Sequence, residues 1–436
     1  MHKWLYSQSL LTGWIPAVAL VLAIVAVAYL LLRRSRLWLI FAVASAGLAM
    51  GIAFLAGWLV IHVLYLWPED LPADVIAWAG VGVWAILLAL GTYFFRPKVL
   101  RAVLVPVAAV LVMAFGGLQI NNYFGEMPTV GALVNGAPAV AQGLPRFLDK
   151  KHGPDPFLHT AVAEDWKAPR GMKEHGVVRE VVIPGTVSHF KEREAVLYLP
   201  AAYFVQHRPA LPVLVLVSGQ PGGPTDFLTA ANLQGAMDSF AQAHNGLAPI
   251  VVIPDPSGTD AGNTMCMNSN IAKADTYMAV DVPHWIKTNL DVDSNPAHWA
   301  VGGFSYGGTC AVQMATRHPH IYPTFAAISS ELEPALTANR AMTIQLAFGG
   351  DAAKFDAVVP MTLLKEHKYP GVQGWFAAGA QDAEYTHNAL VLHEAADKAG
   401  MKTVLTSFPG GHSWKMVTIA FPAMMDWLAG PLGLNR

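Results

Sequence analysis

The feature that most constrains the fold is a series of four long apolar stretches, at about residues 14–32, 37–60, 75–95 and 99–120. A helix needs about 20 apolar residues to cross the ~30 Å hydrocarbon core of a bilayer. These stretches also explain why charged residues make up only 13% of the 436-residue chain, against about 25% in ordinary soluble domains. The sequence therefore predicts a four-helix transmembrane domain over residues 1–120. The alternative, a buried helical core in a soluble protein, explains the length and the regular spacing of the stretches less well.

The charges between these stretches predict the orientation of the domain. Clusters of arginine and lysine follow the first and the third stretch, at residues 33–36 and 96–101, whereas residues 68–74 after the second stretch are acidic. Loops rich in lysine and arginine face the cytoplasm. We therefore expect a multi-pass protein of the cell membrane whose N-terminus and everything after residue 120 lie outside. No acidic or basic residue lies in the middle of a stretch, so we interpret the domain as an anchor among membrane lipids and not as a transport pathway.

The rest of the chain divides into a linker and a second domain. Residues 121–172 combine glycine, proline and mixed charge with little periodicity, which is typical of an extracytoplasmic linker. Over residues 173–436, short runs of Val, Ile and Leu alternate with helix-length segments. This alternation predicts a mostly parallel sheet covered by helices on both faces. The net charge of −2 offers no basic surface for nucleic acid, and nothing in the sequence indicates a metal or a cofactor.

A candidate nucleophile lies in the motif Gly303-Phe304-Ser305-Tyr306-Gly307, between a predicted strand and a predicted helix. A Gly-x-Ser-x-Gly sequence in this context forms a tight turn that exposes the serine at the edge of the sheet. The oxyanion of an acyl-transfer reaction needs two backbone N–H donors. We expect one from Tyr306, directly after the serine, and the other from Gln220 in the Gly- and Pro-rich loop after an earlier strand. The alternative for Gln220 is an ordinary turn.

The serine needs a base, and the base needs an orienting carboxylate. His412 is the candidate base because it follows the last predicted strand, after a pair of glycines. Asp382 follows the penultimate strand and is the first choice for the carboxylate. Glu384, two residues later, is its rival, and Asp351 is a weaker one that suits the start of a helix better.

The only two cysteines, Cys266 and Cys310, are 44 residues apart and belong to no metal-binding pattern. We expect both near the edge of the active site. In an oxidising compartment outside the cell they could form a disulfide. Two separate buried thiols are the alternative.

Taken together, the Gly303–Gly308 motif, the Ser218-Gly219-Gln220 loop and the Gly411–Trp414 segment resemble the esterase D-like branch of the α/β-hydrolases. That branch includes the actinobacterial mycolyltransferases. The resemblance covers about residues 175–430. It implies an α/β-hydrolase domain, a triad of Ser305, His412 and Asp382 or Glu384, and Gln220 and Tyr306 as oxyanion donors.

We therefore expect a membrane-anchored serine esterase or acyltransferase that acts through an acyl-enzyme. Its substrate would be an acyl ester or a lipid of the cell envelope, with water, a sugar or another alcohol as acceptor. Two alternatives remain open at this point. The motif Gly-x-Ser-Tyr-Gly-Gly also occurs in prolyl-oligopeptidase-like serine peptidases, and a non-catalytic envelope-binding protein could keep the same fold.

Overall fold

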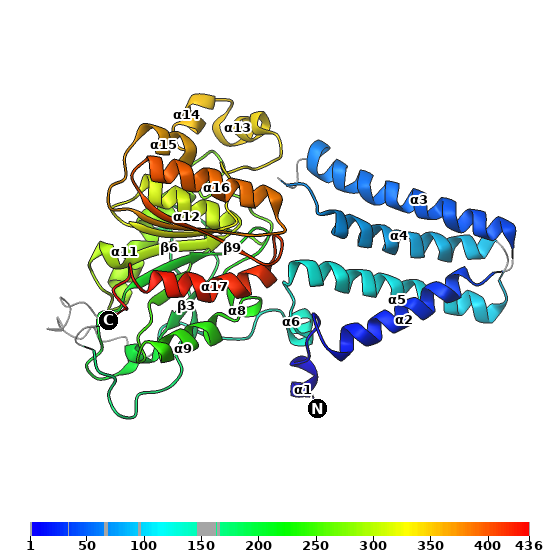
Figure 1. The fold of residues 1–436 in the computed structure, drawn as a ribbon, viewed down its shortest axis with the longest axis horizontal. Coiled ribbons are helices and arrows are strands. Elements are labelled where there is room, and N and C mark those ends of the chain that lie inside the picture. The colour runs from blue at the N-terminus through cyan, green and yellow to red at the C-terminus, as the bar shows by residue number, and fades with distance from the viewer. Residues whose placement is uncertain are drawn as a thin grey trace. The chain divides into compact units, whose positions relative to one another are not determined.

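A computed structural model shows how these segments fold (Figure 1). The structure describes residues 2–33, 35–64, 69–94, 97–145, 163 and 166–435. Arg34 and Arg96, which belong to the basic clusters of the sequence, lie outside the described residues, as does most of 146–165. The described chain forms two compact units, residues 1–136 with the short segment 337–340, and residues 137–336 with 341–436.

The first unit is helical. Its long helices are α2 (Trp14–Leu31), α3 (Arg36–Trp58), which continues as the π-helical turn η1 (Leu59–Val63), α4 (Ala73–Phe94) and α5 (Val99–Phe124). All four are long and apolar enough to cross a membrane. Helix α4 packs between α3 and α5, and α5 also packs against α2. Large side chains on the outer faces, such as Val21, Ile24 and Val43, are more than half exposed. A bundle with apolar side chains on its outer surface is suited to a lipid environment.

Hydrogen bonds show which loops and terminal segments of this bundle lie together. Arg101, at the start of α5, donates a hydrogen bond to the carbonyl of Leu32 after α2, at 2.9 Å. The two basic loops therefore lie at the same end. The short helices α1 (His2–Tyr6) and α6 (Val130–Asn135) also lie together, since the amide of Val130 donates to the carbonyl of Gln8 at 3.0 Å. The segments on either side of the four long helices thus meet each other.

The second unit is built on a sheet of nine strands among the described residues, in the order β1-β2-β3-β5-β4-β6-β7-β8-β9. Strand β2 is antiparallel to β3, and β3 to β5, whereas all other neighbours are parallel. The strands are β1 (Ala141–Gln142), β2 (Val177–Val181), β3 (Ala195–Leu199), β4 (Val213–Val217), β5 (Ile250–Ile253), β6 (Trp299–Phe304), β7 (Thr324–Ile328), β8 (Gln373–Gly379) and β9 (Lys402–Phe408).

Helices cover both faces of this sheet. Figure 1 shows α12 and α16 on one side and α9 and α17 on the other. The central strands β3 to β8 are almost completely buried, as expected for a parallel sheet between two helical layers. The helical segments are η3 (Ala201–Phe204), α8 (Asp226–Thr229), α9 (Leu233–Ala243), α10 (Ala274–Thr276), η4 (Tyr277–Asp281), α11 (Val282–Asn289), η5 (Pro296–His298), α12 (Tyr306–Arg317), α13 (Arg340–Phe348), α14 (Ala352–Asp356), α15 (Pro360–Glu366), α16 (Ala383–Lys398) and α17 (Trp414–Leu428).

The predicted fold class, an α/β-hydrolase domain after four apolar helices, is confirmed. The predicted boundaries differ in detail. Helix α5 continues to Phe124, beyond the predicted end at residue 120, and stops at Gly125 in the left-handed conformation (φ 71°). The predicted linker, 121–172, is partly structured, because it contains α6 and also β1, which pairs with β2. The compact unit that carries the sheet begins at residue 137.

Candidate active site

Ser305 lies on the turn between β6 and α12 and has φ 58° and ψ −120°, a strained conformation for a residue other than glycine. Its amide donates to the carbonyl of Ile328 on β7 at 2.9 Å. The turn needs glycine on both sides. A Cβ on Gly307 would overlap the carbonyl oxygen of Val217, and a Cβ on Gly303 would overlap the backbone of Gly307. The motif therefore holds Ser305, which is only 5% exposed, at the carboxyl end of β6.

His412 reaches Ser305 from the loop after β9. Its Nε2 lies 2.8 Å from Ser305 Oγ. The imidazole lies against the rings of Phe304 and Tyr385, with centroids 4.9 Å and 4.2 Å away. Directly after it, Ser413 caps α17 by accepting a hydrogen bond from the amide of Met416, and Trp414 packs against Phe304. These contacts fix both the position and the plane of the imidazole.

The other imidazole nitrogen of His412 faces Asp382. The distance from Nδ1 to Asp382 Oδ2 is 3.2 Å, and Asp382 Oδ1 accepts from the amide of Tyr385 at the start of α16. Glu384, the rival in the sequence, is exposed on the first turn of that helix. Asp351 caps α14 instead. Of the three carboxylates considered, Asp382 is therefore the one that the structure brings to His412.

The loops that carry Asp382 and His412 are joined to each other. The amide of Gln381 donates to the carbonyl of Gly410 at 3.0 Å, and the side-chain oxygen of Gln381 accepts from the amide of Gly410. A Cβ on Gly379 would overlap the carbonyl of Gly410. Gln381 was not singled out in the sequence, and no local pattern indicates its role, since its partner is 29 residues away.

The two expected oxyanion donors flank Ser305. Tyr306 is the first residue of α12, so its N–H has no partner within the helix. Gln220 follows Gly219, and a Cβ on Gly219 would lie 3.6 Å from the Cβ of Ser305. The loop that carries Gln220 thus passes directly beside the serine.

The side chain of Tyr306 and a disulfide join α12 to the segment after β5. The hydroxyl of Tyr306 accepts from the amide of Cys266 at 3.0 Å and contacts the hydroxyl of Thr264 at 2.9 Å. Burial raises the pKa of Tyr306, which keeps the phenol neutral. Cys266 is bonded to Cys310, one turn along the helix from the serine. Both cysteines are buried.

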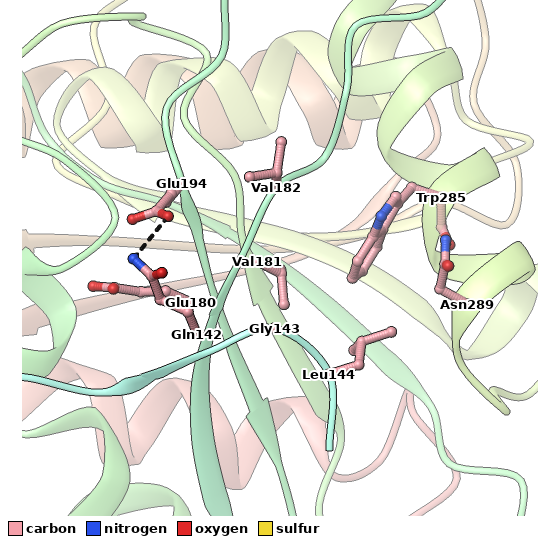
Figure 2. Close-up of a pocket in the computed structure, with 9 residues that line it drawn as sticks. All are labelled: Gln142, Gly143, Leu144, Glu180, Val181, Val182, Glu194, Trp285 and Asn289. Atoms are coloured by element: carbon pink, nitrogen blue, oxygen red, sulfur yellow. Dashed lines mark hydrogen bonds between the residues drawn. The ribbon is translucent and has the colours of Figure 1, made fainter. Parts of the chain in front are cut away.

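A separate pocket of about 380 Å³ lies at the β1–β2 edge of the sheet (Figure 2). In it, Gln142 Nε2 donates to Glu194 Oε1 at 3.1 Å. Burial, together with the nearby Glu194, raises the pKa of Glu180. Strands β3, β5 and β4 separate this edge from β6, so the pocket is not part of the candidate active site. Its lining residues are Gln142, Gly143, Leu144, Glu180, Val181, Val182, Glu194, Trp285 and Asn289.

A serine hydroxyl, an imidazole and a carboxylate in this order form the arrangement that activates serine as a nucleophile. The order along the chain, serine then acid then histidine, is that of α/β-hydrolases. The geometry is therefore suited to acyl transfer through an acyl-enzyme.

Several known proteins are similar to this chain. An uncharacterised protein of Corynebacterium glutamicum is 32% identical over 434 residues, which cover 97% of this chain and 96% of that protein. An S-formylglutathione hydrolase from Agrobacterium tumefaciens has a similar structure, with a TM-score of 0.50 and 16% identity over 60% of this chain and 97% of that one. A ferulic acid esterase gives a TM-score of 0.49 with 17% identity, over 59% of this chain and 99% of that one. At 16% identity, the likeness to the S-formylglutathione hydrolase indicates the fold alone.

The family to which the chain belongs follows from a match over part of its sequence. Residues 188–428 match the Esterase family, a range that includes Ser305, Asp382 and His412 and more than half of the chain. The resemblance to α/β-hydrolase esterases predicted from the motifs is thereby confirmed. The chain belongs to the Esterase family and is a serine hydrolase with the α/β-hydrolase fold, preceded by four helices that are long and apolar enough to cross a membrane.

Proposed function

We propose that this chain is a membrane-anchored, extracytoplasmic serine esterase or acyltransferase that acts on lipid or cell-envelope esters. The observation that carries the proposal is the continuous relay from Ser305 Oγ to His412 Nε2, 2.8 Å, and from His412 Nδ1 to Asp382 Oδ2, 3.2 Å. Membership in the Esterase family supports an ester, rather than a peptide amide, as the bond that is cleaved.

In the first half of the reaction, Ser305 Oγ attacks the acyl carbonyl carbon while His412 Nε2 takes the hydroxyl proton. Asp382 accepts the hydrogen bond of Nδ1–H, which keeps the imidazole in the tautomer that a base needs and stabilises the imidazolium. The carbonyl oxygen becomes an oxyanion that the N–H groups of Gln220 and Tyr306 stabilise. His412 then returns the proton to the leaving alkoxide, and the acyl group remains on Ser305.

In the second half, the acyl-enzyme reacts with an acceptor hydroxyl. His412 takes the proton of the acceptor as its oxygen attacks the acyl carbon, and the same two N–H groups stabilise the second oxyanion. The proton then returns to Ser305 Oγ. Water as the acceptor gives a free acid, and a sugar or another alcohol gives a new ester.

Two features of the described residues support an extracytoplasmic catalytic domain. The basic loops after α2 and before α5 lie at one end of the helix bundle, and basic loops face the cytoplasm. Four spans then leave residues 2–13 and the region after α5 on the outer side. The disulfide between Cys266 and Cys310 is the second feature, because disulfides persist in oxidising compartments outside the cytoplasm. A catalytic domain anchored at the outer surface has envelope lipids as its nearest esters.

A fluorophosphonate probe tests the nucleophile. We expect the wild-type protein to be labelled, Ser305→Ala not to be labelled, and His412→Ala to react at least 100-fold more slowly because the serine loses its base. Ser239→Ala, a change at an exposed serine on α9, is the matched control and should be labelled like the wild type. Equal labelling of Ser305→Ala and the wild type would refute the proposal.

The acyl donor can be identified by trapping. Purified protein is mixed with an envelope lipid extract, the reaction is quenched in acid, and the protein is digested. The mass of the peptide that carries Ser305 is then measured by mass spectrometry. A mass increase equal to a fatty acyl group supports a lipid ester. Turnover of peptide amides without any ester turnover would point to a serine peptidase instead, and no turnover of either would point to a binding protein.

A further inference from the structure

Arg193, just before β3, makes three contacts that connect separate loops near Ser305. Its Nη2 donates to the carbonyl of Gly222 at 2.7 Å and its Nε to Asp255 Oδ2 at 2.5 Å. Its Nη1 pairs with the carboxylate of Asp260. Arg193, Gly222 and the two aspartates come from three different segments of the chain. A single guanidinium thus connects the loop after β4 to the segment after β5 through hydrogen bonds.

The loop after β4, residues 218–224, is the one that carries Gln220. It bends at Gly222, which has φ 151° and donates through its amide to the carbonyl of Asp260 at 2.8 Å. The amide of Gly223 donates to Asp226 Oδ2 at 2.7 Å. A Cβ on Gly223 would lie 3.0 Å from Arg193 Nη2, so the guanidinium packs directly against this glycine. Arg193 thus bonds to the backbone of this loop and also to the segment after β5.

The charges around Arg193 explain why it stays in place. Asp255 is 2% exposed and also accepts the amides of Ser257 and Gly258. Burial alone would lower the pKa of Arg193, but the hydrogen bonds and charges of Asp255 and Asp260 outweigh it and raise that pKa. A planar guanidinium carries its donors on three separate nitrogens and so reaches all three acceptors, whereas an ammonium group carries its three donors on one nitrogen.

We propose that Arg193 is a positioning residue for the oxyanion hole. By fixing the carbonyl of Gly222, it holds the N–H of Gln220, two residues earlier, at the place where the carbonyl oxygen of the substrate becomes negatively charged. The inference rests on the proposed function. Its physical reason is that an oxyanion donor acts in the transition state, where a displacement of about 1 Å can cost on the order of 100-fold in rate.

The first test is the kcat of Arg193→Gln on a p-nitrophenyl ester, divided by the fraction of protein that a fluorophosphonate labels at completion. This division removes misfolded molecules from the result. We expect kcat per labelled site to fall about 10- to 100-fold with KM changed less than twofold. The affinity for a boronic acid analogue of the transition state should fall in parallel with kcat.

Three further variants separate positioning from general stability. Arg193→Lys keeps the charge but places all its donors on a single nitrogen, so we expect a partial loss of kcat. Asp260→Asn removes one of the two charges that hold Arg193, at a side chain that is 88% exposed, but leaves the contact from Arg193 to Gly222, so kcat should fall less than in Arg193→Gln. The double variant Arg193→Gln with Asp255→Asn removes the buried charge along with its partner. It should fold better than the single variant and still lose kcat.

The outcomes are distinguishable. Wild-type kcat per labelled site in Arg193→Gln and in the double variant would overturn the role of Arg193 and leave the esterase intact. The role of Arg193 would also be overturned if those variants showed only a lower melting temperature or a lower labelled fraction, with wild-type kcat per labelled site. A wild-type protein that neither turns over esters nor takes up the probe would instead overturn the proposed function, and the role of Arg193 with it.

Discussion

At the scale of single residues, the candidate site depends on the strained backbone of Ser305. With φ 58° and ψ −120°, the residue occupies a conformation that the surrounding turn must impose. The glycines at 303 and 307 allow the approach of β4, β6 and α12 that does so. The serine is thus directed toward His412 before any substrate arrives, and no rearrangement is needed to form the relay.

Two carboxylate variants distinguish the acid at this scale. Asp382→Asn should lower kcat by about 10³- to 10⁴-fold, because an amide cannot hold the imidazole in the required tautomer. Glu384→Gln should change kcat less than about threefold, since Glu384 is exposed on the first turn of α16. Steady-state ester hydrolysis measures both. A larger loss in Glu384→Gln would assign the orienting carboxylate to Glu384.

Single residues also show how far the sequence predicts the site. Ser305 and Asp382 each follow a buried apolar strand, and His412 follows a strand and a pair of glycines, so their neighbourhood could be predicted from local sequence alone. Arg193 and Gln381 could not, because their partners lie 62 and 29 residues away. No short-range pattern encodes such contacts, and they depend on the order in which the strands join the sheet.

At the scale of elements, Asp281 at the end of η4 holds the turn after β2. Its carboxylate accepts from the hydroxyl of Thr186 and from the amides of Val187 and Ser188, at 2.8 to 3.0 Å. Burial would raise the pKa of Asp281, but these hydrogen bonds outweigh it and lower the pKa below its ordinary value of 3.8. A carboxyl with a lowered pKa in the folded state stabilises it at higher pH. That stabilisation is lost as the pH falls through the folded pKa.

The change Asp281→Asn should therefore destabilise the protein by about 1 to 3 kcal/mol at pH 7, because one amide oxygen replaces two acceptor oxygens. The difference in melting temperature between wild type and variant should shrink as the pH is lowered below 3.8. Thermal unfolding in detergent between pH 3 and pH 7 measures this. A difference independent of pH would show that the charge of Asp281 does not matter.

The disulfide fastens α12 to the segment after β5, across 44 residues. The chain-entropy relation assigns a loop of that length about 4 kcal/mol of stabilisation. The double variant Cys266→Ser with Cys310→Ser should lower the melting temperature by about 10 °C, given the usual 2–4 °C per kcal/mol for domains of this size. An unchanged melting temperature in detergent would contradict a stabilising role for the bond.

The elements also show where sequence patterns stop being informative. Hydropathy located the four apolar helices but not their ends, because α5 continues for several residues past its apolar part until Gly125 ends it. Strand β1 has only two residues, too few for any periodicity. It forms because the edge of β2 is available for pairing, which is a property of the folded sheet.

At the scale of the whole molecule, the orientation in the membrane can be tested with single cysteines. The two native cysteines are bonded to each other, so an added cysteine is the only free thiol. We expect Asp70→Cys to react with a membrane-impermeant maleimide in intact cells, and Lys98→Cys to react only after permeabilisation. The protein without an added cysteine is the control. The reverse pattern would place the catalytic domain in the cytoplasm.

The long interval between Ser305 and His412, 107 residues, has a consequence for biosynthesis. The helix that follows the histidine must dock, with Trp414 against Phe304 and Phe227, before the imidazole can face the serine. A nascent chain that includes Ser305 but not yet His412 therefore has a nucleophile without its base and is inert. The ability to cleave esters arises in one late step, when the C-terminal helix packs onto the sheet.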